Sequence, residues 1–524
     1  MRKFTLLLGG KDLDTGVYEY FPYADKMITD YRMTYKIITQ LKLGQLSEDS
    51  PEAQEYVYAK YCVGRDDTNI KAIEAAYKAS EIFRYMPVSI RRNILGDIHK
   101  KLLEKKEDFL KILITEGHPR KLAEWEFSGM EKAYRDESLD FFKNELWREI
   151  GKIGDETMYW ARKPDGVVCV SPPKNAAASS SLIAGFALLS GNALIIKPPL
   201  RCPVSAIFLW KEIVGEALRS NGAPDGTLNI LVGNSDKITR EWLESPDVND
   251  ILYFGKSEKG LLLAEDIIRA GKKPILELSG NDMMFVWKDA DLEASIEALK
   301  DAFLGSTQIC MVPKAAIVHN DIYERFVNEF VKQVKKMKVG LPSDPETCFS
   351  PVALVDSFFI FLDDAMTKGA KLLFGGNKIN YKGVKDEKGV YLQPTVIVIE
   401  EYQKAFDMLC IKEENFFPLL PIVRIPGSSD KEIFEAMMRF ANTNEYGLRT
   451  SVWAKSNLYV RKFVRHINNS GLLRINSRHV DFSSYLSTHG GTGKSGGPYG
   501  EMNYVWQKTS HLQGISLTRE KNKR

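Results

Sequence analysis

Short hydrophobic runs alternate with helix-like stretches along the middle of the chain, from residue 167 onward. We predict buried β-strands for the apolar runs, at residues 167–170, 193–196, 228–232, 251–253 and 274–277. Helical patterns lie between several of these runs, near residues 180–189, from about 203 to 218, and from about 257 to 269. Strands that alternate regularly with helices form a parallel sheet covered on both faces, and ligands bind such sheets at the carboxyl ends of the strands. The pattern therefore predicts an α/β fold with a ligand site beyond these strand ends.

A second α/β region follows. Asp291 can cap a helix that ends at Gly305. Its apolar face consists of Leu292, Ile296, Leu299 and Phe303. Residues 315–318 are predicted as a strand. The next helix has one apolar face, which we interpret as core, made of Ile322, Phe326, Phe330, Val334 and Met337. The first 150 residues are predicted to be largely helical around residues 72–114, and a polar, glycine-containing connection near residues 151–165 joins them to the sheet.

Composition restricts the class of protein. A length of 524 residues suggests two or three domains, and 72 basic against 69 acidic residues give a net charge of only +3, which provides no electrostatic case for a nucleic-acid partner. No stretch approaches the roughly 18 apolar residues of a membrane helix. Six cysteines without C-x-x-C spacing, and no metal-binding histidine cluster, favour a cytoplasmic enzyme without a metal site. We expect the basic tail at residues 519–524 to be a solvated end.

A glycine-rich segment near the carboxyl end, residues 487–501, matches or nearly matches three signatures at once. Gly491, Gly493 and Gly496 fit a dinucleotide fingerprint, and residues 493–497 fit a nucleophile elbow. Gly493-Lys494-Ser495 resembles the end of a phosphate-binding loop, but Thr488 stands where its first glycine belongs. Each motif needs a buried strand before it and a helix after it, and the polar upstream residues and the downstream proline and glycine provide neither. We therefore expect a structural loop.

Two residues lie where chemistry is expected. Glu277 ends the last apolar strand and faces a glycine turn, so burial could make its carboxylate a general base. Taken alone, it could equally be a capping or solvated acid. Cys310 lies between a helix and a strand, and taken alone it could be an inert core thiol.

Considered together, these segments resemble the aldehyde dehydrogenase superfamily. The Glu-Leu-x-Gly segment at 277–280, Asp-Ala-Asp-Leu at 289–292 and Gln-x-Cys at 308–310 occur in the order and spacing of that family. Further matches lie at residues 194–198, 344–347, 413–418 and 441–448. The resemblance extends from about residue 70 to the end. It implies that Cys310 attacks an aldehyde, that a hydride passes to the nicotinamide of NAD(P), and that Glu277 activates the water that hydrolyses the thioester.

The family's oxyanion donors are the cysteine N–H and an asparagine side chain. Here the corresponding segment reads Pro172-Pro173-Lys174-Asn175, and an ungapped alignment puts Lys174 at the asparagine position. Either a shift of one residue restores the amide of Asn175, or the ammonium of Lys174 replaces it.

Cofactor contacts are also implied by the resemblance. Lys197 matches the lysine at the adenosine ribose, and Glu414 and Phe416 match the pair at the nicotinamide ribose and ring. Leu200 occupies the position where many NAD-preferring relatives carry glutamate, and Arg201 follows it, so NADP is slightly favoured over NAD. Where the family has Gly-Ser-Thr, this chain has residues 255–257: Gly255 matches, and Lys256 adds positive charge near the expected pyrophosphate.

The resemblance implies the following organisation. Residues 1–150 and 168–277 would form a Rossmann-type cofactor domain, 278–485 a catalytic α/β domain, and 151–167 with 486–524 the oligomerisation segments of a homodimer or homotetramer. Residues 478–486 correspond to the substrate entrance, which Phe482 and Tyr485 would line.

Three alternatives remain open at this point. One is a coenzyme A-acylating relative, against which the retained Glu277 argues. The second is a degenerate binding protein, suggested by Lys174 and Lys256, and the third is a nucleoside-triphosphate-binding protein based on residues 493–495 alone.

Overall fold

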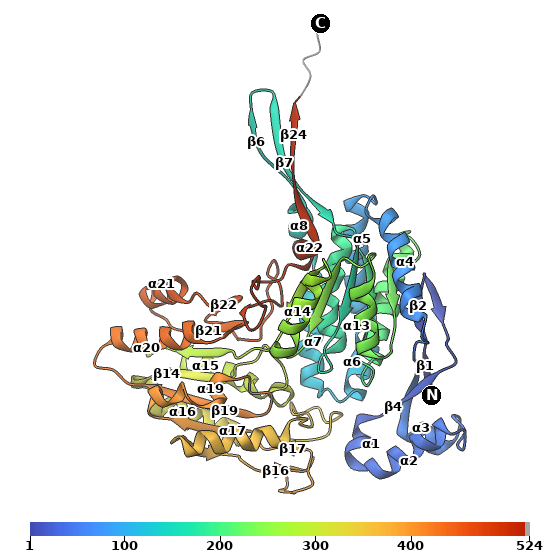
Figure 1. Ribbon diagram of the computed structural model, residues 1–524. Helices are drawn as coiled ribbons and strands as arrows, with labels where there is room; N and C mark the ends of the chain where they lie inside the picture. Colours follow the sequence, from blue (N-terminus) through green and yellow to red (C-terminus); the bar gives the residue numbers. More distant parts are fainter. Residues whose placement is uncertain (519–524) are drawn as a thin grey trace.

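Two α/β lobes lie side by side, and a narrow arm projects from one of them (Figure 1). The computed structural model describes residues 1–518. The basic tail, for which we expected a solvated end, falls outside the described residues. The chain crosses from the first lobe to the second between Glu277 and Met283, where the two sheets described below end and begin.

The first lobe contains a seven-stranded sheet in the order β12-β11-β8-β9-β10-β2-β3. Its strands are β2 (Leu6–Leu8), β3 (Lys11–Leu13), β8 (Val167–Ser171), β9 (Ala193–Ile196), β10 (Leu228–Ile230), β11 (Asp250–Phe254) and β12 (Lys273–Glu277). The strands β8 to β12 are parallel, which confirms the predicted sheet. The antiparallel strands β2 and β3 extend it from the amino terminus, an addition that the hydrophobic pattern did not predict.

Alternate side chains of these strands enter two different hydrophobic clusters. Val167 and Cys169 of β8 pack with α4 (Thr68–Phe83), α13 (Ser235–Glu244) and α14 (Ser257–Arg269) on one face. Val168 and Val170 pack on the other face with the remaining helices. Those helical segments are α5 (Val88–Glu104), α6 (Lys106–Thr115), α7 (Arg120–Ala133), α8 (Asp136–Asn144), α9 (Ala177–Ser181), η1 (Leu182–Gly185), α10 (Phe186–Ser190), α11 (Val204–Phe208), the π-helical η2 (Leu209–Gly215) and α12 (Glu216–Ser220). Burial on both faces explains why these strands are continuously apolar.

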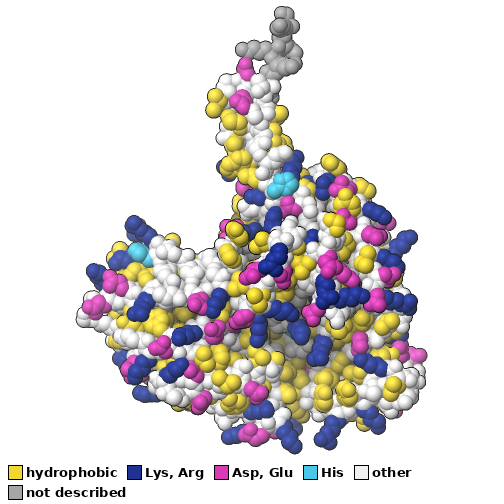
Figure 2. All heavy atoms as spheres, viewed as in Figure 1, with side chains coloured by type: hydrophobic (Ala, Val, Ile, Leu, Met, Phe, Trp, Pro, Cys, Tyr) yellow, Lys and Arg dark blue, Asp and Glu magenta, His cyan; other side chains and the backbone are white. Residues whose placement is uncertain are grey.

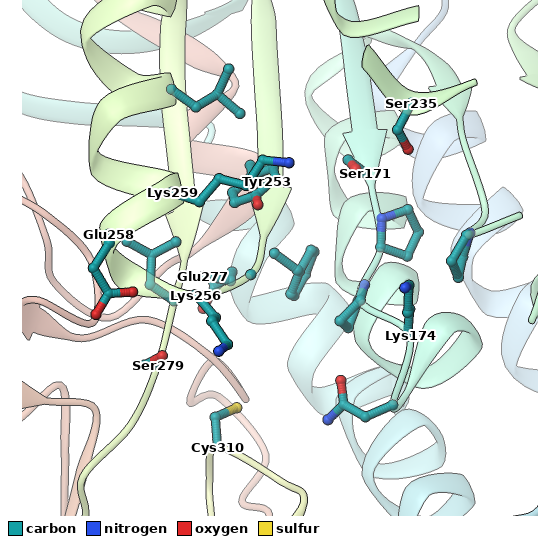
Figure 3. Close-up of a pocket in the computed structure, with 18 of the residues that line it drawn as sticks. Ser171, Lys174, Ser235, Tyr253, Lys256, Glu258, Lys259, Glu277, Ser279 and Cys310 are labelled. Atoms are coloured by element: carbon teal, nitrogen blue, oxygen red, sulfur yellow. The ribbon is translucent and has the colours of Figure 1, made fainter. Parts of the chain in front are cut away.

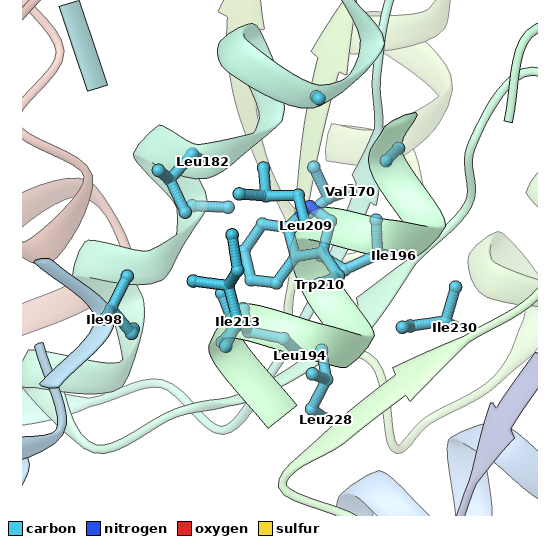
Figure 4. Close-up of a cluster of buried hydrophobic side chains, with 14 of the residues drawn as sticks. Ile98, Val170, Leu182, Leu194, Ile196, Leu209, Trp210, Ile213, Leu228 and Ile230 are labelled. Carbon is cyan, nitrogen blue, oxygen red and sulfur yellow. The ribbon is translucent and has the colours of Figure 1, made fainter. Parts of the chain in front are cut away.

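Trp210 lies at the centre of the second of these clusters (Figure 4). The side chain is fully buried, and its indole N–H donates a 2.8 Å hydrogen bond to Ser181 Oγ. Leu194, Ile196 and Ile213 surround it in Figure 4. Truncation of a buried tryptophan costs about 3–5 kcal/mol, so this residue anchors the helices to the sheet.

The second lobe contains another seven-stranded sheet, in the order β15-β18-β19-β14-β13-β21-β22. Its strands are β13 (Met283–Val286), β14 (Ala315–His319), β15 (Lys371–Phe374), β18 (Thr395–Ile399), β19 (Leu419–Ile425), β21 (Arg449–Trp453) and β22 (Leu472–Ile475). The predicted helices are present as α15 (Leu292–Leu299), capped by Asp291 through a 3.1 Å bond from Ala294 N, and α16 (Asn320–Val334). Both α-helices are shorter than predicted: the first continues as the 3₁₀ segment η3 (Lys300–Thr307), and the second ends before Met337. Further helices of this lobe are α17 (Val355–Thr367), α20 (Asp430–Thr443) and α21 (Asn457–His466).

The arm is an antiparallel sheet of three strands, β24-β7-β6. It consists of β6 (Trp147–Ile153), β7 (Glu156–Pro164) and β24 (Ser510–Thr518). The predicted polar connection near residues 151–165 is therefore wrong, because this stretch forms a hairpin whose second strand pairs along its full length with β24. Most of its side chains are partly or fully exposed, so no core pattern marks the strands in the sequence.

The amino terminus forms a small sheet of its own, β1-β5-β4. Its strands are β1 (Arg2–Phe4), β4 (Tyr18–Pro22) and β5 (Val57–Cys62), and its helices are α1 (Ala24–Thr29), α2 (Tyr31–Lys42) and α3 (Pro51–Tyr56). Phe4, Phe21 and Tyr61 join the large hydrophobic cluster of the first lobe, so this sheet belongs to that lobe.

Candidate functional site

A cavity of about 1260 Å³ lies between the carboxyl edge of the first sheet and the amino edge of the second. Glu277 ends β12, whereas Cys310 precedes β14 and Glu414 precedes β19. The cavity therefore lies at the carboxyl ends of the first sheet's strands, as we expected for a ligand site, and at the amino ends of the second sheet's strands. Predicted site residues that line this cavity are Lys174, Asn175, Lys197, Leu200, Arg201, Gly255, Lys256, Glu277, Cys310, Glu414 and Phe416.

Cys310 lies on the irregular loop that leads into β14. The two residues Ser306 and Thr307 adopt positive φ values of 56° and 64°, a region that is unfavourable for any side chain and especially for a β-branched one. Burial raises the pKa of the Cys310 thiol to about 12, with smaller contributions from Glu414 and Asp282, while the ammonium of Lys314 acts in the opposite direction. In this environment the thiol is protonated at neutral pH.

Glu277 is 5% exposed and is held by two groups from the carboxyl-terminal segment. Asn503 Nδ2 donates to Oε1 at 2.7 Å, and the backbone N–H of Gly490 donates to Oε2 at 3.0 Å. Burial raises the pKa of Glu277 to about 8, although both hydrogen bonds favour the carboxylate. A carboxyl group of this kind can take up a proton near physiological pH, which is the requirement for a general base.

The glycine-rich segment 487–501 is a loop, as predicted, that packs on the end of β12. Its only strand, β23 (Thr492–Gly493), pairs with β20 (Tyr446–Gly447), and the next helix begins at Val505. Leu278 N donates to Ser495 O at 3.0 Å. Gly490 is required because a Cβ there would lie 2.1 Å from Asn503 N. The segment positions Glu277.

Asn175 and Lys174 have different surroundings. Asn175 Nδ2 donates to Gln308 O at 2.9 Å, and Asn175 and Cys310 both line the large cavity and a narrower one that adjoins it. Lys174 is exposed, and Figure 3 shows its ammonium directed away from Cys310. The one-residue shift considered above therefore matches the arrangement of the side chains.

The residues predicted to bind the cofactor also line the large cavity. Lys197 is buried and donates to Ser235 Oγ at 2.8 Å, and burial lowers the pKa of its ammonium to about 8. Leu200 is 41% exposed and Arg201 is exposed beside it. Helix α14 begins at this cavity, and its N-cap residue Lys256 forms no side-chain capping bond, so the first-turn N–H groups have no side-chain acceptor there.

These features fit a dinucleotide. Uncapped helix N–H groups and cationic side chains bind pyrophosphate, and the cavity is also lined by Arg240 and Lys259. A side chain at Gly255 would lie 2.5 Å from the Tyr253 hydroxyl. Glu414, which also lines the cavity, accepts from Gly280 N at 3.0 Å.

The adjoining cavity is narrow, about 40 Å³, and shares Cys310, Asn175 and His489 with the large cavity. Phe482 lines it and packs on Trp125, with ring centroids 5.2 Å apart. Gly129 makes room for this ring, because a Cβ there would lie 2.5 Å from Phe482 Cζ. Tyr485 lines neither cavity: it is 48% exposed and packs edge-on against Phe141, so its predicted place in the tunnel does not match the structure.

Four residues that contact the site were missed by the sequence analysis. Lys314 is fully buried under the Cys310 loop, Asn503 holds Glu277, and Glu126 and His489 line the narrow cavity. A lysine four residues after the cysteine, in an otherwise apolar stretch, was a signal that could have been used. The other three have no local signal, because their partners are distant in the sequence.

Residues 1–518 contain no group of three or more His, Cys, Asp or Glu side chains that could hold a metal ion. Within the same residues, no helix has the length and hydrophobicity to cross a membrane.

Comparison with known proteins agrees with this geometry. The model of the "Aldehyde dehydrogenase family" matches residues 44–515. The lactaldehyde dehydrogenase of Methanocaldococcus jannaschii is 29% identical over 477 residues, which cover 90% of this chain and 96% of that protein. The NADP(+)-dependent succinate-semialdehyde dehydrogenase of Escherichia coli is 28% identical over 461 residues, covering 84% and 89%.

Solved structures show the same fold. The glyceraldehyde-3-phosphate dehydrogenase of Methanocaldococcus jannaschii, complexed with NADP, superposes with a TM-score of 0.74 and 27% identity over 88% of this chain and 97% of that one. The lactaldehyde dehydrogenase of Escherichia coli gives a TM-score of 0.80 at 22% identity over 99% of both chains.

Proposed function

This chain belongs to the aldehyde dehydrogenase family, and on that premise we propose that it oxidises an aldehyde to the carboxylic acid with NAD(P) as the hydride acceptor. The observation that carries the proposal is the convergence of Cys310, Asn175 and Glu277 on one cavity that also has room and cations for a dinucleotide.

Cys310 is the nucleophile in this proposal. The thiol first loses its proton to solvent. The resulting thiolate attacks the carbonyl carbon, and the thiohemiacetal oxygen acquires negative charge. The Asn175 amide, which has a second N–H besides the one bound to Gln308 O, and the Cys310 backbone N–H are the donors for that oxygen. A nicotinamide cofactor held beside Glu414 and Phe416 would supply the hydride acceptor, and loss of the hydride from the same carbon would leave a thioester on Cys310.

Glu277 completes the reaction. Its carboxylate takes a proton from a water molecule, the hydroxide adds to the thioester carbon, and the carboxylic acid leaves as the thiolate is restored. The pKa of about 8 and the two hydrogen bonds that fix the carboxylate support this role rather than transfer to an external thiol.

Lys197 and Arg201 support a slight preference for NADP. Leu200 leaves no acidic group to repel a 2′-phosphate, and Arg201 lines the same part of the cavity. Lys197 matches the ribose lysine of the family and is already directed at Ser235 within the cavity wall.

The lining of the narrow cavity supports an uncharged aldehyde as the substrate, either apolar or carrying a hydroxyl group. No lysine or arginine occurs among the described residues that line it, so a substrate carboxylate would have no cation there. Glu126, buried in this wall, accepts from Ser179 Oγ at 2.6 Å and lies 2.7 Å from His118 Nδ1. Its oxygens would accept a hydrogen bond from a substrate hydroxyl.

The arm supports a homodimer or homotetramer. The strand β24 lies at an edge of its sheet, and edge strands pair readily with other chains. Large apolar side chains on the arm are exposed (Figure 2), namely Trp147, Ile150, Ile153, Trp160, Leu512 and Leu517. We also propose a cytoplasmic location, which is supported by the absence of disulfides among the six cysteines.

The test is absorbance of reduced cofactor with NAD and NADP separately, for lactaldehyde, short and long aliphatic aldehydes, benzaldehyde and succinate semialdehyde. Wild type should turn over the uncharged aldehydes faster than the semialdehyde. Cys310→Ala should abolish turnover, and Cys62→Ala, a buried cysteine in β5, should leave it within about twofold. Wild type inactive toward every aldehyde with both cofactors would overturn the proposal.

A further inference from the structure

Lys314 is a fully buried lysine beneath the loop that carries Cys310. No ion pair with a carboxylate involves it in the described part of the chain. Its Nζ donates instead to three backbone carbonyls: Thr307 O at 2.9 Å, Ile309 O at 2.7 Å and Asn415 O at 3.0 Å. Burial of an ammonium group is unfavourable unless its N–H groups are all bonded, and here the three bonds match its three donors. Because all three N–H groups of the ammonium are bonded to backbone carbonyls, we infer that Lys314 has a structural role in this loop.

The bond to Ile309 O determines where the Cys310 N–H points. The two groups belong to one trans peptide, in which C=O and N–H are directed oppositely. Because the carbonyl is directed at Lys314, the N–H is directed away from it. Within residues 1–518 this N–H has no hydrogen-bond acceptor. A charged donor on the carbonyl also polarises the peptide and makes its N–H a stronger donor.

The loop before Cys310 needs external support. Ser306 and Thr307 have the unfavourable positive φ values given above, and such conformations persist only where surrounding contacts determine them. Three successive carbonyls before the cysteine are held by side chains: those of residues 307 and 309 by Lys314, and that of residue 308 by Asn175. Lys314 and Asn175 thus both hold this loop in place through hydrogen bonds to its carbonyls.

The third bond connects this loop to the cofactor side. Asn415 stands between Glu414 and Phe416, and Lys314 Nζ is 5.4 Å from the centre of the Phe416 ring. One ammonium group therefore ties the cysteine loop to the segment that faces the nicotinamide part of the cavity.

We propose that Lys314 is a positioning residue that orients the Cys310 peptide as an oxyanion donor and fixes it relative to the Glu414–Phe416 segment. The inference rests on the proposed function for the identity of the oxyanion, but its geometry involves only residues of this chain.

Two reactions of Cys310 separate this role from a general effect on the thiol. Acylation by p-nitrophenyl acetate passes through a tetrahedral oxyanion, as the thiolate adds to the ester carbonyl and p-nitrophenolate leaves. Alkylation by iodoacetamide, in which the thiolate displaces iodide, has no oxyanion. Both are followed at Cys310 by peptide mass spectrometry, with Cys310→Ala as the blank. If a variant slows acylation more than it slows alkylation, the change in the ratio of the two rates measures the loss of the oxyanion donor.

Lys314→Met removes the three bonds at nearly constant volume. The matched control is Lys272→Met, a buried lysine that likewise donates to carbonyls, Ser245 O at 2.5 Å and Val248 O at 2.9 Å, at the other end of β12. We expect Lys314→Met to slow acylation at least tenfold more than alkylation, and Lys272→Met to change this ratio less than twofold. Lys314→Arg keeps the charge without the geometry, so it should restore alkylation while acylation stays slow.

A folded Lys314→Met protein whose acylation and alkylation slow equally, or not at all, would overturn the proposal. If that variant does not fold, Lys314→Arg gives the same decision: an acylation to alkylation ratio equal to that of wild type overturns the proposal. Neither assay uses an aldehyde or a cofactor. Wild type that shows the dependence on Lys314 but oxidises no aldehyde would therefore refute the proposed function and leave this inference standing.

Discussion

Asn503 donates a 2.7 Å hydrogen bond to the carboxylate of Glu277, although 226 residues separate them in the chain. The bond stabilises the charged form of a buried acid whose pKa is raised to about 8. The carboxyl-terminal segment therefore favours the carboxylate of the residue that we propose as the general base, against the larger effect of burial.

Replacing Asn503 with leucine should raise the pKa of Glu277 further. The amide favours the carboxylate, so its loss favours the protonated form, and the rise of kcat with pH should move to higher pH. The measurement is kcat from about pH 6 to about pH 10, with Asn221→Leu, an amide remote from the site, as control. An unchanged profile in a folded Asn503→Leu protein would contradict the assignment of the base.

Glu277→Gln should separate the two halves of the reaction. Because the glutamine cannot deprotonate water, hydride transfer should proceed once per Cys310 and steady turnover should fall by roughly 10²–10⁴-fold. Rapid mixing should show a burst of reduced cofactor of about one equivalent, followed by a slow phase. Loss of the burst together with turnover would mean that Glu277 acts before thioester formation.

Alkylation of Cys310 without cofactor should become faster as pH rises. Because burial raises the pKa of this thiol to about 12, the thiolate fraction should keep increasing up to about pH 10 without a plateau. Iodoacetamide and peptide mass spectrometry give the rate at each pH. A plateau near neutral pH would show that the thiol is already ionised in the free protein.

Leu200→Glu should shift the cofactor preference toward NAD. A carboxylate at this position would repel a 2′-phosphate and accept hydrogen bonds from the ribose hydroxyls, and the ratio of kcat/KM for NADP to that for NAD should fall roughly tenfold or more. Leu200→Gln is the control, because it keeps the size without the charge. Equal ratios in the two variants would argue against a 2′-phosphate site at this place.

Charges on the arm should dissociate the oligomer. The double variant Ile153→Asp and Leu517→Asp places carboxylates on side chains that are 72% and 51% exposed in the single chain. Light scattering coupled to gel filtration should give the mass of one chain. The control Ile82→Asp with Leu458→Asp, at side chains 63% and 58% exposed outside the arm, should keep the wild-type mass. A monomeric wild type would end the proposal of an arm-mediated interface.

The sequence by itself determined the five parallel strands of the first sheet and indicated the main catalytic candidates, but of the second sheet it predicted only the strand at residues 315–318. Residues 167–170 and 193–196 are apolar on both faces, because helices cover the sheet on both sides, and such runs are recognisable without a partner. Glu277 and Cys310 were recognisable from the order of short motifs around them. The arm was not recognisable from the sequence, because β6 and β7 expose most of their side chains and lack the alternating pattern of a half-buried strand.

Only the tertiary structure decided which groups meet. Whether Lys174 or Asn175 faces Cys310 depends on where the loop after β8 turns, a shift of one residue that no local pattern marks. The partners of Lys314 include Asn415, which is 101 residues away. Such contacts arise when two lobes close on one cavity, since the free energy of burying an ammonium or a carboxylate depends on donors and acceptors that distant segments bring.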